Sequence, residues 1–329
     1  MSVTLADVAK AAGLSGSTVS RALSAPEKVN PQTRERVRKL AEEMGYVPNH
    51  TARSLTSGRT DILGLIVPDI ANPFFPPIIK AVQARAQAKG RTVLIADTDE
   101  RPADEILRAG EMRARVDGLI FVSPRSEAKV LTEMAGLGPA VFINRVIPDQ
   151  TSIIIDSGDG MRQAVEHLAA LGHRTIAYLN GPRRSWSNQQ REKAVADAAA
   201  EFGLTMREYG PFEPQVQSGV HAADLILASD VTGVIAYDDL IALGVMARLN
   251  ERHVTVGRDM SIIGVDDSPM SSMAYPTLTT VAVPGLQAGA AAVDAIVRRL
   301  EAPDADSETI TLETRLTVRS STGLVPQKA

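Results

Sequence analysis

Residues 61–283 alternate short apolar runs with segments of helical periodicity, and this alternation limits the fold more than any other feature of the chain. The apolar runs lie at residues 62–67, 92–96, 118–122, 140–143, 152–155, 175–179, 233–236, 261–265 and 278–282. Helical segments such as 73–89, 159–171 and 240–250 separate most of them. Continuous apolar strands that alternate with helices are typical of parallel sheets covered on both faces. The pattern therefore predicts an α/β fold, with room for two doubly wound parallel sheets.

Polar residues follow most of these runs, where open α/β sheets bind their ligands. The candidates at the strand ends are Asp69, Asp97, Ser123, Asn144, Arg145, Asp156, Asp238, Asp239, Asp266 and Asp267. Carboxylates accept hydrogen bonds from hydroxyl groups and arginine donates a fork of them, so this set suits a polyhydroxyl ligand. Trp186, the single tryptophan, could stack on a sugar or base.

Each of these residues also has a structural interpretation. Asp156 and Asp238 could cap the helices that follow them, and Trp186 could be buried or lie in a loop. His167 and His173 flank a predicted helix end at Gly172 and are expected to cap and pack rather than to bind a ligand.

Composition excludes several kinds of site. The chain has no cysteine, hence no disulfides or thiolate metal sites. It contains no Gly-x-Gly-x-x-Gly, no phosphate loop and no His-Glu-x-x-His. No apolar run approaches the roughly 18 residues of a membrane span, and the N-terminus has no secretory pattern. We therefore expect a cytoplasmic protein without metal or cofactor that does not contact a membrane and is not an enzyme.

The first 45 residues predict a separate, all-helical head. Thr4 and Asp7 have the spacing of a capping box, and Gly13 suits a helix end. Ser15 can begin a second helix, and Asn30-Pro31 a third. The spacing predicts a helix-turn-helix unit.

The second of these helices is the candidate for a DNA groove. Its first turns carry Gly16, Ser17, Thr18, Ser20 and Arg21. Recognition helices contact bases from their N-terminal residues, although Ser17 and Thr18 could serve only as first-turn caps. Residues 1–60 hold nine Lys/Arg and five Asp/Glu, a net of +4 in a chain of net charge −4. A basic head on an acidic body suits a polyanionic partner.

A short helical segment is expected at residues 50–57, between Pro48-Asn49 and Gly58. So short a helix is marginal alone and needs DNA or a second copy beside it. Leu55 on such a helix could wedge between base steps in a minor groove, or could simply pack on the core.

Five motifs in this order resemble the lactose-repressor (LacI/GalR) family of bacterial transcription regulators. They are Val3-Thr-Leu-Ala-Asp-Val-Ala9, Ser15-Gly-Ser-Thr-Val-Ser-Arg-Ala-Leu23, Thr33-Arg34, Gly45-Tyr-Val-Pro-Asn49 and Ala52-Arg-Ser-Leu55. The resemblance implies a homodimer on near-palindromic double-stranded operator DNA, with paired hinge helices in the central minor groove and Leu55 intercalated. The residues expected to contact DNA are Thr4, Ser15, Gly16, Ser17, Thr18, Ser20, Arg21, Asn30, Thr33, Tyr46, Asn49, His50, Ala52, Arg53 and Leu55.

The body also resembles that family, whose effector domain is two-lobed and similar to periplasmic sugar-binding proteins. Matching marks include Asn72-Pro-Phe-Phe75, Gly172-His-Arg174, Arg191 and Asp266-Asp267. The resemblance implies effector contacts at Asn72, Phe74, Ser187, Arg191, Asp238 and Asp266, to which the strand-end residues Asp69, Asp97, Ser123, Arg145 and Trp186 are added. Asp238 stands where the family commonly has Asn, and Lys193 where it usually has Gly.

The expected organisation has three parts: a DNA-binding domain at 1–48, a hinge helix and linker at 49–60, and an effector and dimerisation domain at 61–329. Within the last, the N-lobe comprises about 61–156 and 284–329, and the C-lobe about 157–283. The predicted function is a DNA-binding regulator, expected to be a repressor, whose operator affinity is switched by a sugar or nucleoside. The alternatives are a sugar-binding protein or an enzyme on the same two-lobed fold.

Overall fold

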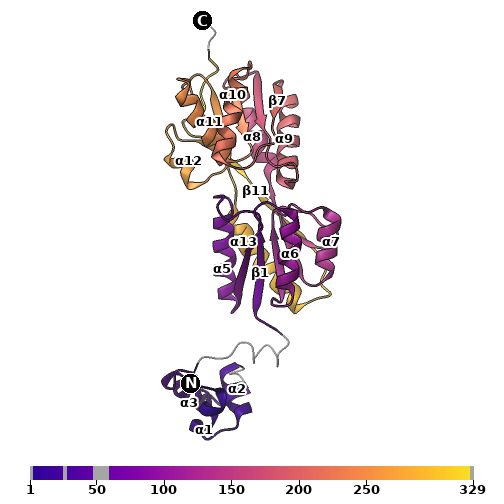
Figure 1. The fold of residues 1–329 in the computed structure, drawn as a ribbon, viewed down its shortest axis with the longest axis vertical. Helices are drawn as coiled ribbons and strands as arrows, with labels where there is room; N and C mark the ends of the chain where they lie inside the picture. Colours follow the sequence, from indigo (N-terminus) through magenta and orange to yellow (C-terminus); the bar gives the residue numbers. More distant parts are fainter. Residues whose placement is uncertain (1–2, 25–27, 47–58, 327–329) are drawn as a thin grey trace. The chain divides into compact units, whose positions relative to one another are not determined.

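The structure is a computed structural model that describes residues 3–24, 28–46 and 59–326 (Figure 1). The chain divides into two compact units, residues 1–60 and 61–329, and each is described by itself.

The first unit contains α1 (Leu5–Ala12), α2 (Gly16–Ser24) and α3 (Pro31–Glu43). Apolar residues at helical spacing converge on one small core made of Val8, Ala9, Ala12, Val19, Ala22, Val37 and Ala41. The predicted caps are confirmed. Thr4 and Asp7 form a capping box, and Gly13 ends α1 with φ 63°. Asn30 accepts the Gln32 N–H at 2.9 Å at the start of α3.

The second unit holds two six-stranded sheets. The first has the order β11-β5-β4-β3-β1-β2, and its pairings are parallel. Its strands are β1 (Ile62–Val67), β2 (Thr92–Asp97), β3 (Gly118–Val122), β4 (Ala140–Ile143), β5 (Thr151–Asp156) and β11 (Thr309–Glu313). The helices α5 (Phe75–Ala88) and α13 (Gly285–Glu301) contribute to the core on one face. The helices α6 (Pro102–Arg113) and α7 (Ala128–Gly136) contribute to the core on the other.

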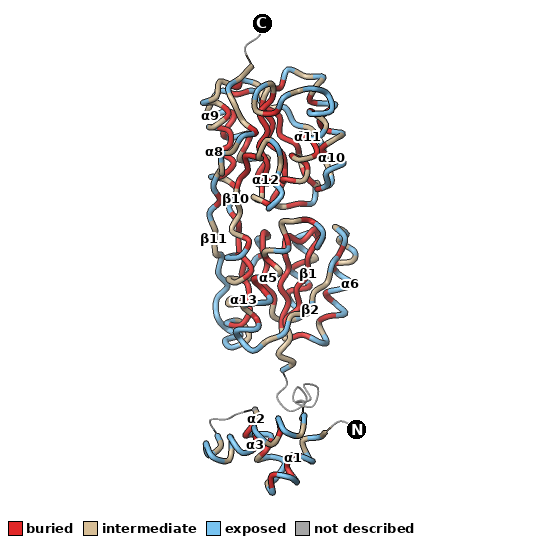
Figure 2. The backbone as a smooth tube through the Cα atoms, turned by 90° about the vertical axis from the view of Figure 1, so that its left-hand side faces the viewer, coloured by how far each residue is buried: buried red, intermediate tan, exposed pale blue. Residues whose placement is uncertain are grey.

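The second sheet repeats this plan with the order β12-β10-β9-β8-β6-β7. Its strands are β6 (Thr175–Leu179), β7 (Thr205–Tyr209), β8 (Gly233–Ala236), β9 (Ser261–Asp266), β10 (Thr279–Ala282) and β12 (Arg315–Thr317). One core lies against α8 (Ser157–Ala170) and α9 (Trp186–Phe202), and the other against α10 (Val216–Leu227) and α11 (Asp239–Glu251). The buried strands and exposed outer helix faces are visible in Figure 2. The prediction of two doubly wound sheets is confirmed.

The predicted assignment of all of residues 284–329 to the N-lobe is wrong. The chain crosses between the lobes three times: at β5–α8, between β10 and α13, and between β11 and β12. Strand β12 pairs antiparallel with β10, and Ser321 Oγ donates to the Ile262 carbonyl at 2.6 Å. Residues from Arg315 onward therefore belong to the C-lobe, because the edge of the C-lobe sheet offers them backbone partners.

Strands β7, β11 and β12 were not predicted from the sequence. The side chains of β7 and β11 are exposed or half-buried, and β12 is only three residues long. All three lie at sheet edges, so they lack the continuous apolar run that marks a buried strand.

Candidate functional site

Helix α2 presents a polar outer face. Val19 and Ala22 point into the core of the first unit, whereas Gly16, Ser17, Ser20 and Arg21 are exposed. Arg21 Nε donates to the Ser17 carbonyl at 3.1 Å, which holds the guanidinium along the helix surface. This face can approach a duplex without unfolding any part of the core.

Several predicted DNA contacts have structural roles as well. Ser15 Oγ accepts the Thr18 N–H at 3.2 Å and therefore caps α2, as Thr4 and Asn30 cap the other two helices. Thr33 is half-buried, and Tyr46 packs against the core of the head. Asn49, His50, Ala52, Arg53 and Leu55 lie outside the described residues.

The clearest site in the second unit joins side chains from both lobes. Asn72, in the loop after β1, donates from Nδ2 to Asp238 Oδ2 at 3.4 Å. The other Asp238 oxygen accepts the Ile241 N–H at 2.9 Å and caps α11, which confirms the capping interpretation. The pKa of Asp238 is raised to about 7: burial is the main cause and the neighbouring Asp239 adds to it, while the Ile241 N–H, Arg191 and Asn72 oppose the rise. One carboxylate thus serves helix capping and contact between the lobes.

Arg191 extends this cluster within the C-lobe. It is projected by the second turn of α9, and its side chain is only 4% exposed. Nη1 donates to the Tyr237 carbonyl at 2.6 Å, Nε donates to Ser157 Oγ at 3.3 Å, and the guanidinium lies 5.0 Å from the Tyr237 ring centre. Its Nη2 is 3.8 Å from Asp266 Oδ1. Arg191 is therefore held in place before any ligand binds.

Asp266 ends β9 in an unusual environment. Its backbone has φ 113°, its side chain is 7% exposed, and its Oδ1 has no hydrogen-bond partner among the described residues. Burial raises the pKa of Asp266 well above its ordinary value, Arg191 opposes that rise, and Asp239 and Asp238 add to it. A buried acceptor without a partner costs free energy until a donor reaches it. Asp266 is therefore the acceptor best suited to a ligand hydroxyl.

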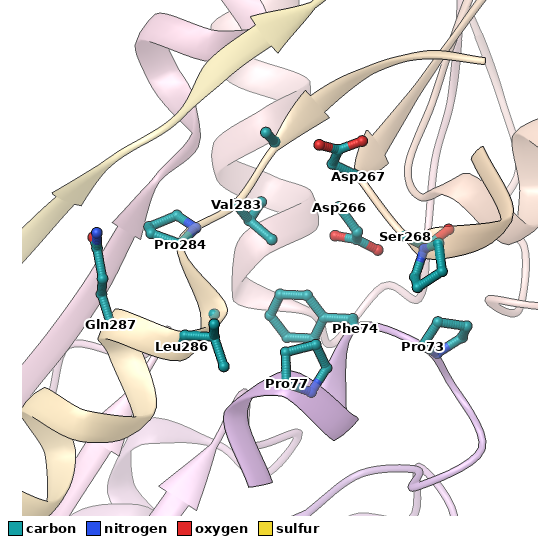
Figure 3. A pocket seen from close by; sticks show the side chains of 13 residues that line it. Pro73, Phe74, Pro77, Asp266, Asp267, Ser268, Val283, Pro284, Leu286 and Gln287 are labelled. Carbon is teal, nitrogen blue, oxygen red and sulfur yellow. The ribbon is translucent and has the colours of Figure 1, made fainter. Parts of the chain in front are cut away.

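A cavity of about 340 Å³ lies beside Asp266 (Figure 3). Phe74 and Pro77 from the start of α5 line it together with Val283 and Pro284 from the segment between β10 and α13. The structure thus brings Phe74 and Asp266 into one cavity, and Asn72, Arg191 and Asp238 into the polar cluster connected to it through the Arg191–Asp266 contact. Ser187 is buried on the first turn of α9, and Trp186, the first residue of that helix, is half-buried.

The remaining strand-end candidates serve the N-lobe framework. Asp69 accepts the Ala71 N–H at 2.8 Å, and exposed Asp97 accepts the Ile70 N–H at 3.0 Å. Ser123 Oγ accepts from Asn144 Nδ2 at 3.3 Å. Arg145 donates to the Ser126 carbonyl at 3.4 Å. These contacts hold the loops at the sheet edge, and none of them joins Asp69 or Asp97 to the Asn72–Asp238 cluster.

Sequence reasoning missed Arg125. This buried arginine binds both oxygens of Glu100 and donates to the Ser123 carbonyl at 2.9 Å. Burial raises the pKa of Tyr237 in the C-lobe, and the charge of Arg125 opposes that rise. Arg125 comes three residues after the end of β3 and outside any recognisable motif, although a basic residue so close to Ser123 was a usable signal.

Asp239 and His173 turn out to be structural. Asp239 accepts from the Ser268 N–H at 2.8 Å and from Thr280 Oγ1 at 2.7 Å, as well as from Ser271 Oγ. His173 is buried between Thr232 and Ser261, at 2.8 and 2.9 Å, as the packing interpretation predicted. Within the described ranges, no set of three His, Asp or Glu side chains could hold a metal ion, and none of the helices there is long and apolar enough to cross a membrane.

Residues 4–49 match the family model of bacterial regulatory proteins, lacI family, and residues 165–322 match a periplasmic binding protein-like domain. The chain is 32% identical to HTH-type transcriptional regulator DegA of Bacillus subtilis over 98% of each chain. The chain belongs to the LacI family. Its function is that of a DNA-binding transcriptional regulator, which confirms the prediction from the five motifs.

Two solved structures show that the family likeness extends to the fold. A lac repressor dimer bound to operator and the anti-inducer ONPF superposes with a TM-score of 0.88 at 29% identity, covering 98% of this chain and all of that one. The complex of the transcriptional regulator CelR with cellobiose superposes with a TM-score of 0.73 at 29% identity, covering 97% of this LacI-family chain and 99% of that one.

Proposed function

We propose that a small polar effector binds in the cleft around Asn72, Arg191, Asp238 and Asp266 and thereby changes how tightly this LacI-family regulator holds its operator. The observation that carries the proposal is the 3.4 Å contact between Asn72 and Asp238, which come from different lobes. A ligand that replaces or bridges this pair has a different binding free energy for closed and open lobes. Linkage then makes operator affinity depend on the ligand.

The residues favour a sugar, a nucleoside or a related compound as the effector. Asp238 and Asp266 are acceptors for hydroxyl groups, Arg191 supplies donors, and Phe74 offers a flat apolar face. The cellobiose complex of the similar regulator CelR supports a saccharide.

The protein is proposed to act as a homodimer on a near-palindromic operator, in the manner of the lac repressor dimer that it resembles. Helix α2 of each copy would enter a major groove, and Leu55 would wedge the central minor groove. We also propose a cytoplasmic, non-catalytic role. The relatives are transcription regulators, and the cleft carboxylates cap a helix or contact arginine rather than activate a nucleophile.

Two measurements on the full chain test the proposal. Fluorescence anisotropy with palindromic fragments from the gene's own promoter region measures operator binding, and a thermal-shift screen of sugars and nucleosides finds the effector. A ligand at about 100 Kd should stabilise the protein by roughly 2.7 kcal/mol. Asn72→Ala should keep operator binding but lose the response to the effector, whereas Asn250→Ala, an exposed change on α11, should keep both.

Two results would contradict the proposal. The first is a failure to bind any such fragment with or without ligand. The second is an Asn72→Ala variant with an unchanged ligand response, which would place the effector elsewhere.

A further inference from the structure

The cavity beside Asp266 has an asymmetric lining. Its walls from Phe74, Pro77, Val283, Pro284 and Leu286 are apolar, and its polar groups lie mainly on the β9 side (Figure 3). Its volume of about 340 Å³ falls at the lower end of the roughly 300–1,000 Å³ typical of pockets that enclose a whole small ligand. The cavity can therefore receive a ligand, or a large part of one.

The charge of the lining is one-sided. All the lining residues belong to the described part of the chain; they include Asp266 and Asp267 but no Lys, Arg or His. Asp267 is already paired, because Arg319 Nη2 lies 2.6 Å from its Oδ1. Asp266 differs, since its side chain is more than nine-tenths buried and its Oδ1 has no hydrogen-bond partner among the described residues.

The two arginines nearest these carboxylates are already occupied. Arg191 donates to the Tyr237 carbonyl at 2.6 Å and to Ser157 Oγ at 3.3 Å. Arg319 donates to the Leu278 carbonyl at 2.8 Å in addition to Asp267. Turning either guanidinium toward an anion would give up these bonds to buried acceptors, which is costly. The remaining Arg191 nitrogen, Nη2, already lies 3.8 Å from Asp266 Oδ1, so it offsets the charge of that carboxylate.

An anionic ligand would therefore lack a cationic partner in the lining in either protonation state of Asp266. If Asp266 is ionised, a phosphate or carboxylate group would be placed beside a like charge in a desolvated site. If burial keeps Asp266 protonated, the lining offers only neutral donors, namely the O–H groups of Asp266 and Ser268 and the amide of Gln287, and still no cation, although a buried anion is best held by charged donors. A hydroxyl group satisfies Asp266 without either cost.

We propose that this cavity selects uncharged, hydroxyl-bearing effectors and rejects their phosphorylated counterparts, and that Asp266 is the residue that enforces the selection. The inference rests on the proposed function of the effector cleft, and it adds that the effector carries no charge. The apolar walls admit the C–H face of a ring on Phe74, while hydroxyl groups donate to Asp266.

The test is calorimetric titration of the full chain with matched pairs: glucose and glucose 6-phosphate, ribose and ribose 5-phosphate, cytidine and cytidine monophosphate, cellobiose and its phosphate ester. We expect the uncharged member of a pair to bind at least about 100-fold more tightly than its phosphate, since like charges in contact cost several kcal/mol. Asp266→Asn, which keeps the shape and removes the charge, should reduce that ratio by about tenfold or more.

Asp304→Asn is the matched control. It removes the same charge at an exposed position beyond the far end of α13, a 17-residue helix about 25 Å long whose N-terminus borders the cavity. The ratio should be unchanged in this variant. If circular dichroism shows that Asp266→Asn does not fold, the affinities of the unaltered protein for each uncharged ligand and its phosphate still show whether the cavity rejects phosphates.

Three outcomes would overturn the inference. One is a phosphate ester that binds as tightly as its parent; if it also changes operator affinity, the proposed function stands and only the charge selection fails. Another is the same ratio of affinities, uncharged ligand to phosphate, in Asp266→Asn as in Asp304→Asn. The third is no binding by any member of any pair while operator binding is intact, which would overturn the effector cleft and the charge selection together.

Discussion

Asp238→Asn offers the sharpest test of how the cleft is built, because its effect on stability should depend on pH. Burial raises the pKa of Asp238 from 3.8 to about 7 in the folded protein. Above pH 3.8 the unfolded chain ionises this carboxyl while the folded chain retains the proton. Stability is therefore lost as pH rises from about 4 to 7, and the loss is constant above pH 7.

The magnitude follows from the two pKa values. The difference between 3.8 and about 7 corresponds to about 4 kcal/mol at pH 8. Asparagine removes this cost and can still accept the Ile241 N–H, but it places a donor where Asn72 now donates, which sacrifices about 1 kcal/mol. The variant should thus be more stable by about 3 kcal/mol at pH 8, by about 1 kcal/mol at pH 5.5, and not at all below pH 4.

Urea unfolding followed by the fluorescence of Trp186, at several pH values, measures this difference. Trp186 is the single tryptophan and opens α9, five residues before Arg191 on the same helix. Asp304→Asn, an exposed change, should stay within about 0.5 kcal/mol at every pH. A variant that is less stable at pH 8, or a difference that does not change between pH 5 and 8, would refute the assigned burial of the charge. We expect the same variant to respond less to the effector, because Asp238 lies in the proposed effector cleft, where a ligand-binding carboxylate would be kept at a cost in stability.

Asp239→Ala should destabilise the protein by about 3 kcal/mol or more in urea unfolding, because it leaves three buried donors without an acceptor; a loss under 1 kcal/mol would mean that water replaces the carboxylate. Gly219→Ala should destabilise the protein by about 1–3 kcal/mol or more, since its Cβ would lie 2.0 Å from the Ile241 carbonyl oxygen. In the control Gly136→Ala the new Cβ meets nothing within 4 Å, so this change should be neutral or slightly stabilising. Similar melting temperatures for the two variants would contradict the close packing of α10 on α11. Operator affinity should fall steeply with salt, and Arg21→Ala should weaken binding if the exposed face of α2 contacts DNA; a flat salt dependence in anisotropy titrations would exclude phosphate contacts.

The sequence by itself determined the local architecture. Apolar runs such as 118–122 and the helical periodicity between them specify parallel strands and their covering helices, because burial on both faces imposes a continuous apolar pattern. Short-range signals were equally sufficient for the caps at Thr4 and Asn30, since a capping hydrogen bond spans only two or three residues. The five motifs of the head were sufficient to place the chain in the LacI family.

The tertiary structure decided what depends on contacts between distant residues. That β12 leaves the N-lobe for the edge of β10 cannot be read from the sequence, because this three-residue edge strand has no apolar run of its own. The Arg125–Glu100 pair, the contact of Asn72 with Asp238 and the contact of Arg191 with Asp266 each join segments that the topology, not the local sequence, brings together. Aspartates at strand ends look alike in the sequence. Only burial and partners separate Asp239, which holds the C-lobe together, from Asp266, whose Oδ1 accepts no hydrogen bond among the described residues.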